Sequence, residues 1–276
     1  MRVLENSSLP KSFSGPFGAE YAWRPTWGVL ERSYIRMFGL LDLPGRLRAR
    51  IVMAELDRLR VRKVLDLGSG TGCYSFYLSR NNGTDITGVE MDGCRVSESS
   101  HIAQRLGRGN LKFLCGRANE YLKTFPSEVF EMALAIEVLQ YLGEVPAILQ
   151  ETYRVLKPGG YLLGHVPVLG YLRPGERTLF DDDKIQEILF ESHFQIIEIK
   201  PTFGGIPRKL CSLYNRLSRW RLLVGILFPV ILLVSAAFQV ENPDGDYRFF
   251  IARKPAEKMK ENQGPKDEDG GMGHED

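Results

Sequence analysis

The chain has 276 residues, a length that suits one large domain or two small ones. Hydrophobic residues make up 43% and charged residues 25%, which excludes wholesale disorder, collagen-like repeats and a polytopic membrane protein. The net charge of +2 provides no global basic field of the kind that holds nucleic acid, so no nucleic-acid partner is predicted.

Residues 1–62 form an aromatic and basic lead-in. Within it, residues 43–59 carry Leu47, Ile51, Leu56 and Leu59 at helical spacing, which predicts an amphipathic helix. The aromatic residues before this helix suit either a lid over a ligand site or packing on a sheet. Of these aromatic residues, Tyr21 and Trp23 are the two that we place near a ligand or substrate.

From residue 63 onwards, short apolar runs alternate with helix-like segments. Helices are predicted at 146–156, closed by the stop signal Lys157–Gly160, and at 181–191, capped by acidic residues. The predicted strands cover residues 63–67, 85–90, 111–115, 131–136, 161–167, 195–200 and 247–253. Alternation of this kind predicts a mostly parallel sheet with helices on both faces.

The segment after the first strand reads Gly68-Ser69-Gly70-Thr71-Gly72, with Asp66 two residues before the first glycine. Glycines let the backbone turn and leave main chain bare for a ligand, and the following helix offers N–H donors to an anion. The GxGxG spacing differs from the dinucleotide fingerprint GxGxxG. A loop that offers both an aspartate and N–H donors suits an amino acid better than a bare pyrophosphate. The competing interpretation is a purely structural turn.

Glu90 closes the second predicted strand, where a carboxylate can accept hydrogen bonds from both hydroxyls of a ribose. Met91 beside it can pack on an adenine face. A solvated loop acid is the alternative for Glu90.

Four motifs in succession resemble those of the class I S-adenosylmethionine-dependent methyltransferases. They are VLDLGSGTG, GVEMD, FEMALAIEVLQYL and LQETYRVLKPGGYLLGHVP. The resemblance implies an α/β, Rossmann-like fold with a seven-stranded, mostly parallel sheet in the order 3-2-1-4-5-7-6, whose seventh strand is antiparallel. It also implies S-adenosyl-L-methionine as the cofactor.

The resemblance further implies cofactor-binding residues. Gly68, Ser69 and Gly70 would hold the methionine portion within the loop that ends at Gly72, and Asp66 would support the amino group. Glu90 would bind the ribose and Met91 would lie against adenine. The family usually has GDA after the third strand, where this chain has Gly116-Arg117-Ala118-Asn119. Arginine accepts no hydrogen bond, so Asn119, next to Ala118, is the substitute acceptor for the adenine amino group.

The fourth motif is similar to the EVLEH-type sequences of O-methyltransferases from ubiquinone biosynthesis and sugar modification. Glu137 would face the cofactor cleft from the carboxyl end of its strand, as a cofactor-binding and catalytic residue, and its expected partner is His165, at a similar depth on the next strand. His165 is predicted either as a general base that takes a hydroxyl proton, or as a hydrogen-bonded structural histidine. No histidine or acidic cluster has metal-ligand spacing, so no metal is expected.

A hydrophobic insertion between the last two strands is the distinctive feature. Residues 201–240 contain no acidic residue, and five basic residues precede an uncharged stretch at 222–240. The stretch is long enough to span a membrane. The strands before and after the insertion are expected to be neighbours in one sheet, however, so both of its ends must lie on the same side of the membrane. Pro229 is expected to kink or break its helix, so that two half-segments dip into one leaflet and return. The competing interpretation is a soluble cap that buries this surface, for example in a dimer.

These observations predict a methyltransferase that O-methylates a lipophilic or lipid-linked acceptor while bound to an anionic membrane surface. We expect a cytoplasmic protein, peripheral on the inner face of the cytoplasmic membrane, because the N-terminal residues do not resemble a signal peptide. The alternatives are a soluble small-molecule methyltransferase with the insertion as substrate cap, and a non-catalytic cofactor-binding protein. The expected organisation is a lead-in, a core, the insertion, the last strand and a disordered polar tail, over residues 1–62, 63–203, 204–245, 246–255 and 256–276.

Overall fold

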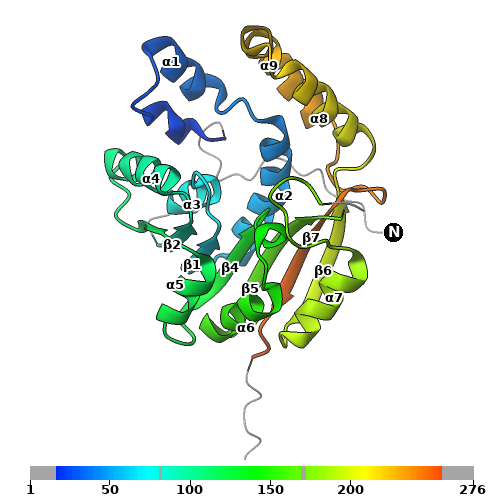
Figure 1. Cartoon of the computed structure of the whole chain (residues 1–276). Coiled ribbons are helices and arrows are strands. Elements are labelled where there is room, and N and C mark those ends of the chain that lie inside the picture. The colour runs from blue at the N-terminus through cyan, green and yellow to red at the C-terminus, as the bar shows by residue number, and fades with distance from the viewer. Residues whose placement is uncertain (1–16, 81–82, 169–171, 257–276) are drawn as a thin grey trace, which may run out of the picture.

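The computed structural model describes residues 17–80, 83–168 and 172–256. Its strands form one seven-stranded sheet in the order β3-β2-β1-β4-β5-β7-β6 (Figure 1). The strands are β1 (Lys63–Leu67), β2 (Asp85–Glu90), β3 (Leu111–Cys115), β4 (Phe130–Ile136), β5 (Leu156–Pro167), β6 (Gln195–Thr202) and β7 (Tyr247–Arg253). The first five pair in parallel, and β7 runs antiparallel between β5 and β6. The predicted fold class and strand order are confirmed.

Helices connect the strands and cover the sheet. In chain order, the helices before β3 are η1 (Ala19–Trp23), α1 (Val29–Phe38), α2 (Leu43–Leu59), α3 (Cys73–Ser79) and α4 (Gly93–Arg105). The helices after β3 are α5 (Ala118–Thr124), η2 (Leu139–Tyr141), α6 (Val145–Val155), α7 (Asp182–Glu191), α8 (Gly205–Leu217) and α9 (Arg221–Ala236). Several begin at an aspartate whose carboxylate accepts from N–H groups of the first turn, as Asp92 does for α4 and Asp181 for α7.

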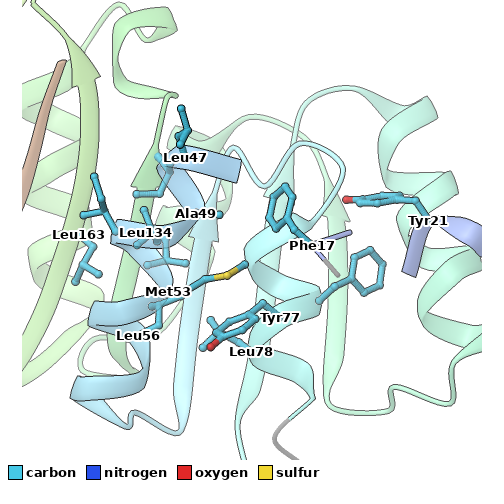
Figure 2. Close-up of a cluster of buried hydrophobic side chains, with 14 of the residues drawn as sticks. Phe17, Tyr21, Leu47, Ala49, Met53, Leu56, Tyr77, Leu78, Leu134 and Leu163 are labelled. Carbon is cyan, nitrogen blue, oxygen red and sulfur yellow. The ribbon is translucent and has the colours of Figure 1, made fainter. Parts of the chain in front are cut away.

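Side chains that alternate along the strands build two separate cores. In β4, Met132 and Leu134 pack on one face with α2, α3 and α4, while Ala133 and Ala135 face the core formed with α5, α6 and α7. Figure 2 shows part of the first core, where Leu47 and Met53 of α2 lie against Leu134 and Leu163 of the sheet. Because both faces are covered, the edge formed by the carboxyl ends of the parallel strands is left for a ligand.

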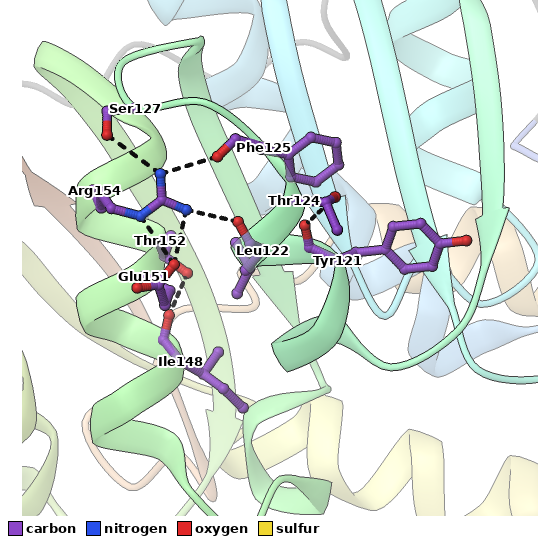
Figure 3. Close-up of polar contacts among 9 residues, drawn as sticks. All are labelled: Tyr121, Leu122, Thr124, Phe125, Ser127, Ile148, Glu151, Thr152 and Arg154. Carbon is purple, nitrogen blue, oxygen red and sulfur yellow. Dashed lines mark hydrogen bonds and ion pairs between the residues drawn. The ribbon is translucent and has the colours of Figure 1, made fainter.

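An arginine at the end of α6 connects that helix to α5 (Figure 3). The Arg154 guanidinium donates to the carbonyl oxygens of Leu122 and Phe125 and to the Ser127 hydroxyl, and it pairs with Glu151 at 2.8 Å. Carbonyl groups at the end of a helix lack helical donors, so these bonds satisfy the end of α5. We assign this cluster to stability.

Strand β5 is longer than the sequence predicted. It begins at Leu156, which pairs with Phe130, and it includes the Lys157–Gly160 segment that was interpreted as a stop signal before a strand starting at Tyr161. An irregularity in the β4–β5 pairing between Phe130 and Met132, together with the left-handed backbone of Gly159 at φ 81°, lets the segment remain in the strand.

Helices α8 and α9 form the insertion between β6 and β7. The expectation that Pro229 would break the apolar stretch into two half-segments was wrong, because α9 runs without interruption from Arg221 to Ala236. Among the residues that the structure describes, no helix has the length and apolar character needed to span a membrane. The tail predicted to be disordered lies outside the described residues from 257 onwards.

Candidate functional site

The loop after β1 contains three glycines with left-handed backbone. Their φ angles are 63° at Gly68, 57° at Gly70 and 83° at Gly72. A Cβ added at Gly68 would lie 2.3 Å from Val138, and one at Gly72 would lie 2.6 Å from Phe113. At Gly70 the nearest atoms would be 4.0 Å away. Internal packing therefore requires glycine at two of these positions, whereas at Gly70 an added Cβ would meet only atoms at van der Waals distance, so packing does not require glycine there.

Two backbone N–H groups of this region bind the carboxylate of Glu90. The Gly70 N–H donates to Glu90 at 2.8 Å, and the Asp92 N–H donates to the other oxygen of that carboxylate at 2.9 Å. The Ser69 hydroxyl oxygen is buried and has no hydrogen-bond partner within the described chain. A buried hydroxyl without a partner is costly, so a polar ligand atom at this position would stabilise it.

Asp66 lies in β1, two residues before Gly68. Its side chain is buried and accepts a hydrogen bond from the Ser75 hydroxyl at 2.7 Å. Burial, followed by repulsion from the nearby Glu90 carboxylate, raises the pKa of Asp66 to about 7. A ligand ammonium would supply the missing positive charge.

The remaining predicted cofactor residues follow the ends of β2 and β3. The Met91 side chain is 69% exposed directly after β2. Ala118 is buried at the first position of α5 and Asn119 is half-buried beside it, whereas Arg117 is exposed. The parallel pairing of β2 with β3 brings Glu90 opposite Cys115, so these segments share the edge that carries the glycine loop.

These residues fit the cofactor that the sequence motifs imply. The unpartnered Ser69 hydroxyl, the Gly70 position where packing does not require glycine, and the uncompensated Asp66 carboxyl suit a ligand that carries both an ammonium and a carboxylate. Among the described residues, no group of three His, Cys, Asp or Glu side chains could hold a metal ion.

A second polar cluster lies where β4 and β5 end. Glu137 has left-handed backbone, with φ 56°, and its carboxylate meets His165 Nδ1 at 2.8 Å and the Arg48 guanidinium at 3.1 Å. The other ring nitrogen, His165 Nε2, lies 3.0 Å from the Thr202 hydroxyl. The sequence thus predicted the right partner for Glu137, while Arg48 and Thr202 were missed.

The protonation of this cluster follows from its charges. Burial alone would raise the pKa of Glu137, but the hydrogen bond from His165 and the charge of Arg48 outweigh it and lower that pKa. An ionised Glu137 only accepts, so His165 donates through Nδ1, and the Thr202 hydroxyl donates to Nε2. Burial lowers the pKa of His165, so the ring is neutral.

This geometry separates the two residues predicted to be catalytic. The His165 side chain is 1% exposed and both ring nitrogens are engaged, whereas the Glu137 side chain is 22% exposed. A general base must reach the proton that it accepts. For His165 to do so, Thr202 would first have to leave Nε2.

Two further residues adjoin His165. The Tyr247 ring stacks on the imidazole with centroids 5.1 Å apart, and Arg173 donates to the Tyr247 hydroxyl at 2.8 Å. Neither residue belongs to a sequence motif, so they were missed. The pairing of β7 with β5 places Phe249 opposite His165 and so brings the start of β7, with Tyr247, close to His165.

The lead-in contacts the glycine loop through Tyr21. Its buried hydroxyl donates to the Thr71 carbonyl oxygen and lies 3.0 Å from the Thr71 hydroxyl. Tyr21 therefore lies against the glycine loop. Trp23 contacts the Arg36 and Arg105 guanidinium groups, which lie 5.2 and 5.7 Å from its ring centroid.

Comparison with known proteins finds similarity to methyltransferases. The family described as "Methyltransferase domain" matches residues 65–164. A sterol 24-C-methyltransferase of Neurospora crassa is 34% identical over 39% of this chain and 28% of its own length. The O-methyltransferase resE of Aspergillus sclerotiorum is 26% identical over 59% of this chain and 69% of its own length. The chain spans less than a third of the sterol methyltransferase.

Solved structures show the same fold. The [4+2]-cyclase SpnF superposes with a TM-score of 0.55, at 24% identity, over 76% of this chain and 82% of its own. Phosphoethanolamine N-methyltransferase 2 of Haemonchus contortus, in complex with S-adenosyl-L-methionine, gives a TM-score of 0.56 at 19% identity, over 74% of this chain and 52% of its own. At this identity the likeness shows a Rossmann-like fold, and a fold by itself does not determine an activity.

Proposed function

Residues 65–164 match the family described as "Methyltransferase domain", and from this premise we propose that the chain is an S-adenosylmethionine-dependent methyltransferase. The observation that carries the proposal is the glycine loop. It has one glycine, Gly70, that packing does not require, it contains Ser69, whose buried hydroxyl has no partner among the described residues, and it follows the buried Asp66. When bound, S-adenosylmethionine supplies an activated methyl group on a sulfonium, which an aligned nucleophile takes in a single displacement.

Each cofactor-binding residue has a proposed role. Asp66 accepts from the ligand ammonium, and the loop from Gly68 to Gly72 binds the methionine portion through Ser69 and Gly70. Glu90 turns from the Gly70 N–H to the ribose hydroxyls. Met91 lies against the adenine face, with Ala118 and Asn119 along its edge.

In the proposed mechanism the Glu137 carboxylate contacts the hydroxyl of the substrate that accepts the methyl group. Its carboxylate is ionised and partly exposed, so it orients an acceptor hydroxyl and takes the proton as the methyl group is transferred. His165 and Arg48 hold that carboxylate in place. Alignment of the acceptor supplies the larger part of the rate. The competing assignment, with His165 as the base, requires displacement of Thr202.

We propose a lipophilic or lipid-linked acceptor, O-methylated at the inner face of the cytoplasmic membrane. Exposed apolar side chains on α9 support this proposal, because a chain that meets lipid can keep such side chains uncovered. Similarity to proteins named sterol 24-C-methyltransferase and squalene methyltransferase is compatible with an apolar acceptor. The resemblance of the fourth motif and the proton-accepting Glu137 favour oxygen as the acceptor atom.

A second candidate is a methyltransferase for a small polar metabolite, with α8 and α9 as a cap. Similarity to a protein named phosphoethanolamine N-methyltransferase 3 favours it. A third is a protein that binds the cofactor without transferring the methyl group. The fold shared with a [4+2]-cyclase shows that this architecture also serves other chemistry.

The test incubates the full chain with methyl-labelled S-adenosylmethionine and, in separate reactions, a membrane lipid extract or an aqueous metabolite extract, followed by separation of organic and aqueous products. We expect the label in the organic phase, and much less labelled product from Gly70→Ala at a cofactor concentration below its dissociation constant. Label only in the aqueous phase would favour the metabolite enzyme. Calorimetric binding without labelled product from either extract would favour the non-catalytic protein, and absence of binding would overturn all three.

A further inference from the structure

Helix α9 keeps one apolar face uncovered. The opposite face packs into the first core through Val224 and Phe228, which are buried. The uncovered side chains recur at intervals of three and four residues, and Ile226 and Leu233 are each 75% exposed. They are Leu222, Leu223, Ile226, Leu227, Val230, Leu233 and Val234. A continuous exposed face of this size marks an interaction surface.

Helix α1 extends this face. The Tyr34 hydroxyl donates to the Gly225 carbonyl oxygen at 2.7 Å, which joins α1 to α9. Leu30 and Met37, one turn on either side of Tyr34, are 86% and 65% exposed. Both helices lie beyond the carboxyl edge of the parallel strands (Figure 1). We name the exposed apolar residues of α9, together with Leu30 and Met37, the apolar face.

The charges of α8, which lies beside α9, are positive. Lys209, Arg216 and Arg219 are exposed, and none has an ion-pair partner among the described residues, whereas Arg208 pairs with Asp246 at 2.7 Å. No acidic residue occurs from 201 to 240. A second copy docked about a two-fold axis would bring these cations together, whereas an anionic lipid surface would neutralise them.

We propose that α1 and α9 dock as one unit on an anionic leaflet. The apolar face enters the edge of the hydrocarbon, while Lys209, Arg216 and Arg219 lie among the headgroups. This inference deepens the proposed function and rests on its membrane location, and it adds α1 to the docking surface. Docking in this orientation turns the carboxyl edge of the parallel strands, which carries Glu137, towards the lipid.

The test is sedimentation of the full chain with two kinds of vesicle, phosphatidylcholine alone and phosphatidylcholine mixed with phosphatidylglycerol. We expect binding to the mixed vesicles. The pairs Ile226→Gln/Val230→Gln and Leu30→Gln/Met37→Gln should each weaken it by about tenfold or more, because each removes buried apolar area. Phe190→Gln is the matched control, since Phe190 is 79% exposed on α7, distant from this face.

Charge is tested separately. Lys209→Glu/Arg216→Glu should weaken binding to the mixed vesicles by about tenfold or more and should remove its salt dependence, whereas the control Lys112→Glu should not. Equal binding by the apolar pairs and the wild type would overturn the proposal. A dimer that Ile226→Gln/Val230→Gln dissociates, without vesicle binding, would assign the face to a second copy and would also overturn it.

Cofactor binding is measured on the same variants. The variants should bind S-adenosylmethionine with the affinity of the wild type, because the substituted residues Ile226, Val230, Leu30 and Met37 lie outside the glycine loop. Loss of vesicle binding with intact cofactor binding therefore tests docking alone. Intact vesicle binding by a chain that binds no cofactor would instead overturn the proposed function while the docking surface remains.

Discussion

The Tyr34 hydroxyl donates to the carbonyl oxygen of Gly225, the one that Pro229 leaves without a donor in α9. In an α-helix the N–H of residue 229 would bond to the carbonyl of residue 225, and proline has no N–H. A side chain of the lead-in therefore satisfies a backbone group of the insertion, 191 residues away in the sequence.

This relationship predicts a double-mutant cycle. Tyr34→Phe leaves the Gly225 carbonyl unpaired and should reduce the free energy of unfolding by about 1–2 kcal/mol in urea. In a Pro229→Ala background the alanine N–H takes over, so the same change should cost much less. Equal costs in both backgrounds would show that the hydroxyl does not serve this carbonyl.

Two glycine substitutions should separate folding from binding. In Gly70→Ala the added Cβ meets only atoms at van der Waals distance, so the backbone strain should cost only about 1–2 kcal/mol of stability, while S-adenosylmethionine affinity falls at least tenfold. Gly68→Ala would meet Val138 and should destabilise the fold by about 2–4 kcal/mol, strain included. Thermal melting and calorimetry measure the two effects. Unchanged affinity in Gly70→Ala would remove the loop from the cofactor site.

Cofactor binding should depend on pH through Asp66, whose pKa is about 7. Below that pH the free protein holds a proton that the ligand ammonium must displace, so affinity should rise about tenfold between pH 6 and pH 8. Asp66→Asn should bind weakly, without this dependence. A wild-type dissociation constant that is flat over this range would show that Asp66 does not meet the ammonium.

The same group affects stability in the opposite direction. Its pKa in the fold lies above the ordinary value of 3.8, so the fold binds the proton more tightly than the unfolded chain. That contribution is fully present below about pH 4 and is lost as the pH rises to about 7. Without cofactor, urea unfolding of Asp66→Asn should lack this loss. An equal decline in the variant would place its cause elsewhere.

Substitutions of Glu137 and His165 should distinguish their roles. Glu137→Gln keeps a hydrogen-bonding side chain but accepts no proton, so turnover should fall by about 100-fold or more with cofactor affinity retained. Thr202→Val should leave turnover lowered only modestly, because it frees Nε2 without touching Glu137. If Glu137→Gln is nearly normal and His165→Gln loses about 100-fold, His165 is the base that the sequence first suggested.

The sequence could predict the strands and their order because each strand is a local apolar run and the motif succession implies the topology. It also predicted that Glu137 and His165 would lie close together. Arg48 could not be found in this way, because its contact with Glu137 depends on how α2 lies over the end of β4. The prediction that Pro229 would break its helix was wrong for a similar reason. The donor that replaces the missing proline N–H, the Tyr34 hydroxyl, comes from a distant segment.

The position of β7 has a consequence for the order of folding. This strand lies between β5 and β6, although both precede it in the chain and α8 and α9 come before it. Until β7 has been synthesised, the edges of β5 and β6 that pair with it have no partner, and α9, with its uncovered apolar face, has already been made. A nascent chain at this stage therefore exposes more unpaired backbone and apolar surface to chaperones or lipid than the finished protein does. Early contact with a membrane would cover part of that surface.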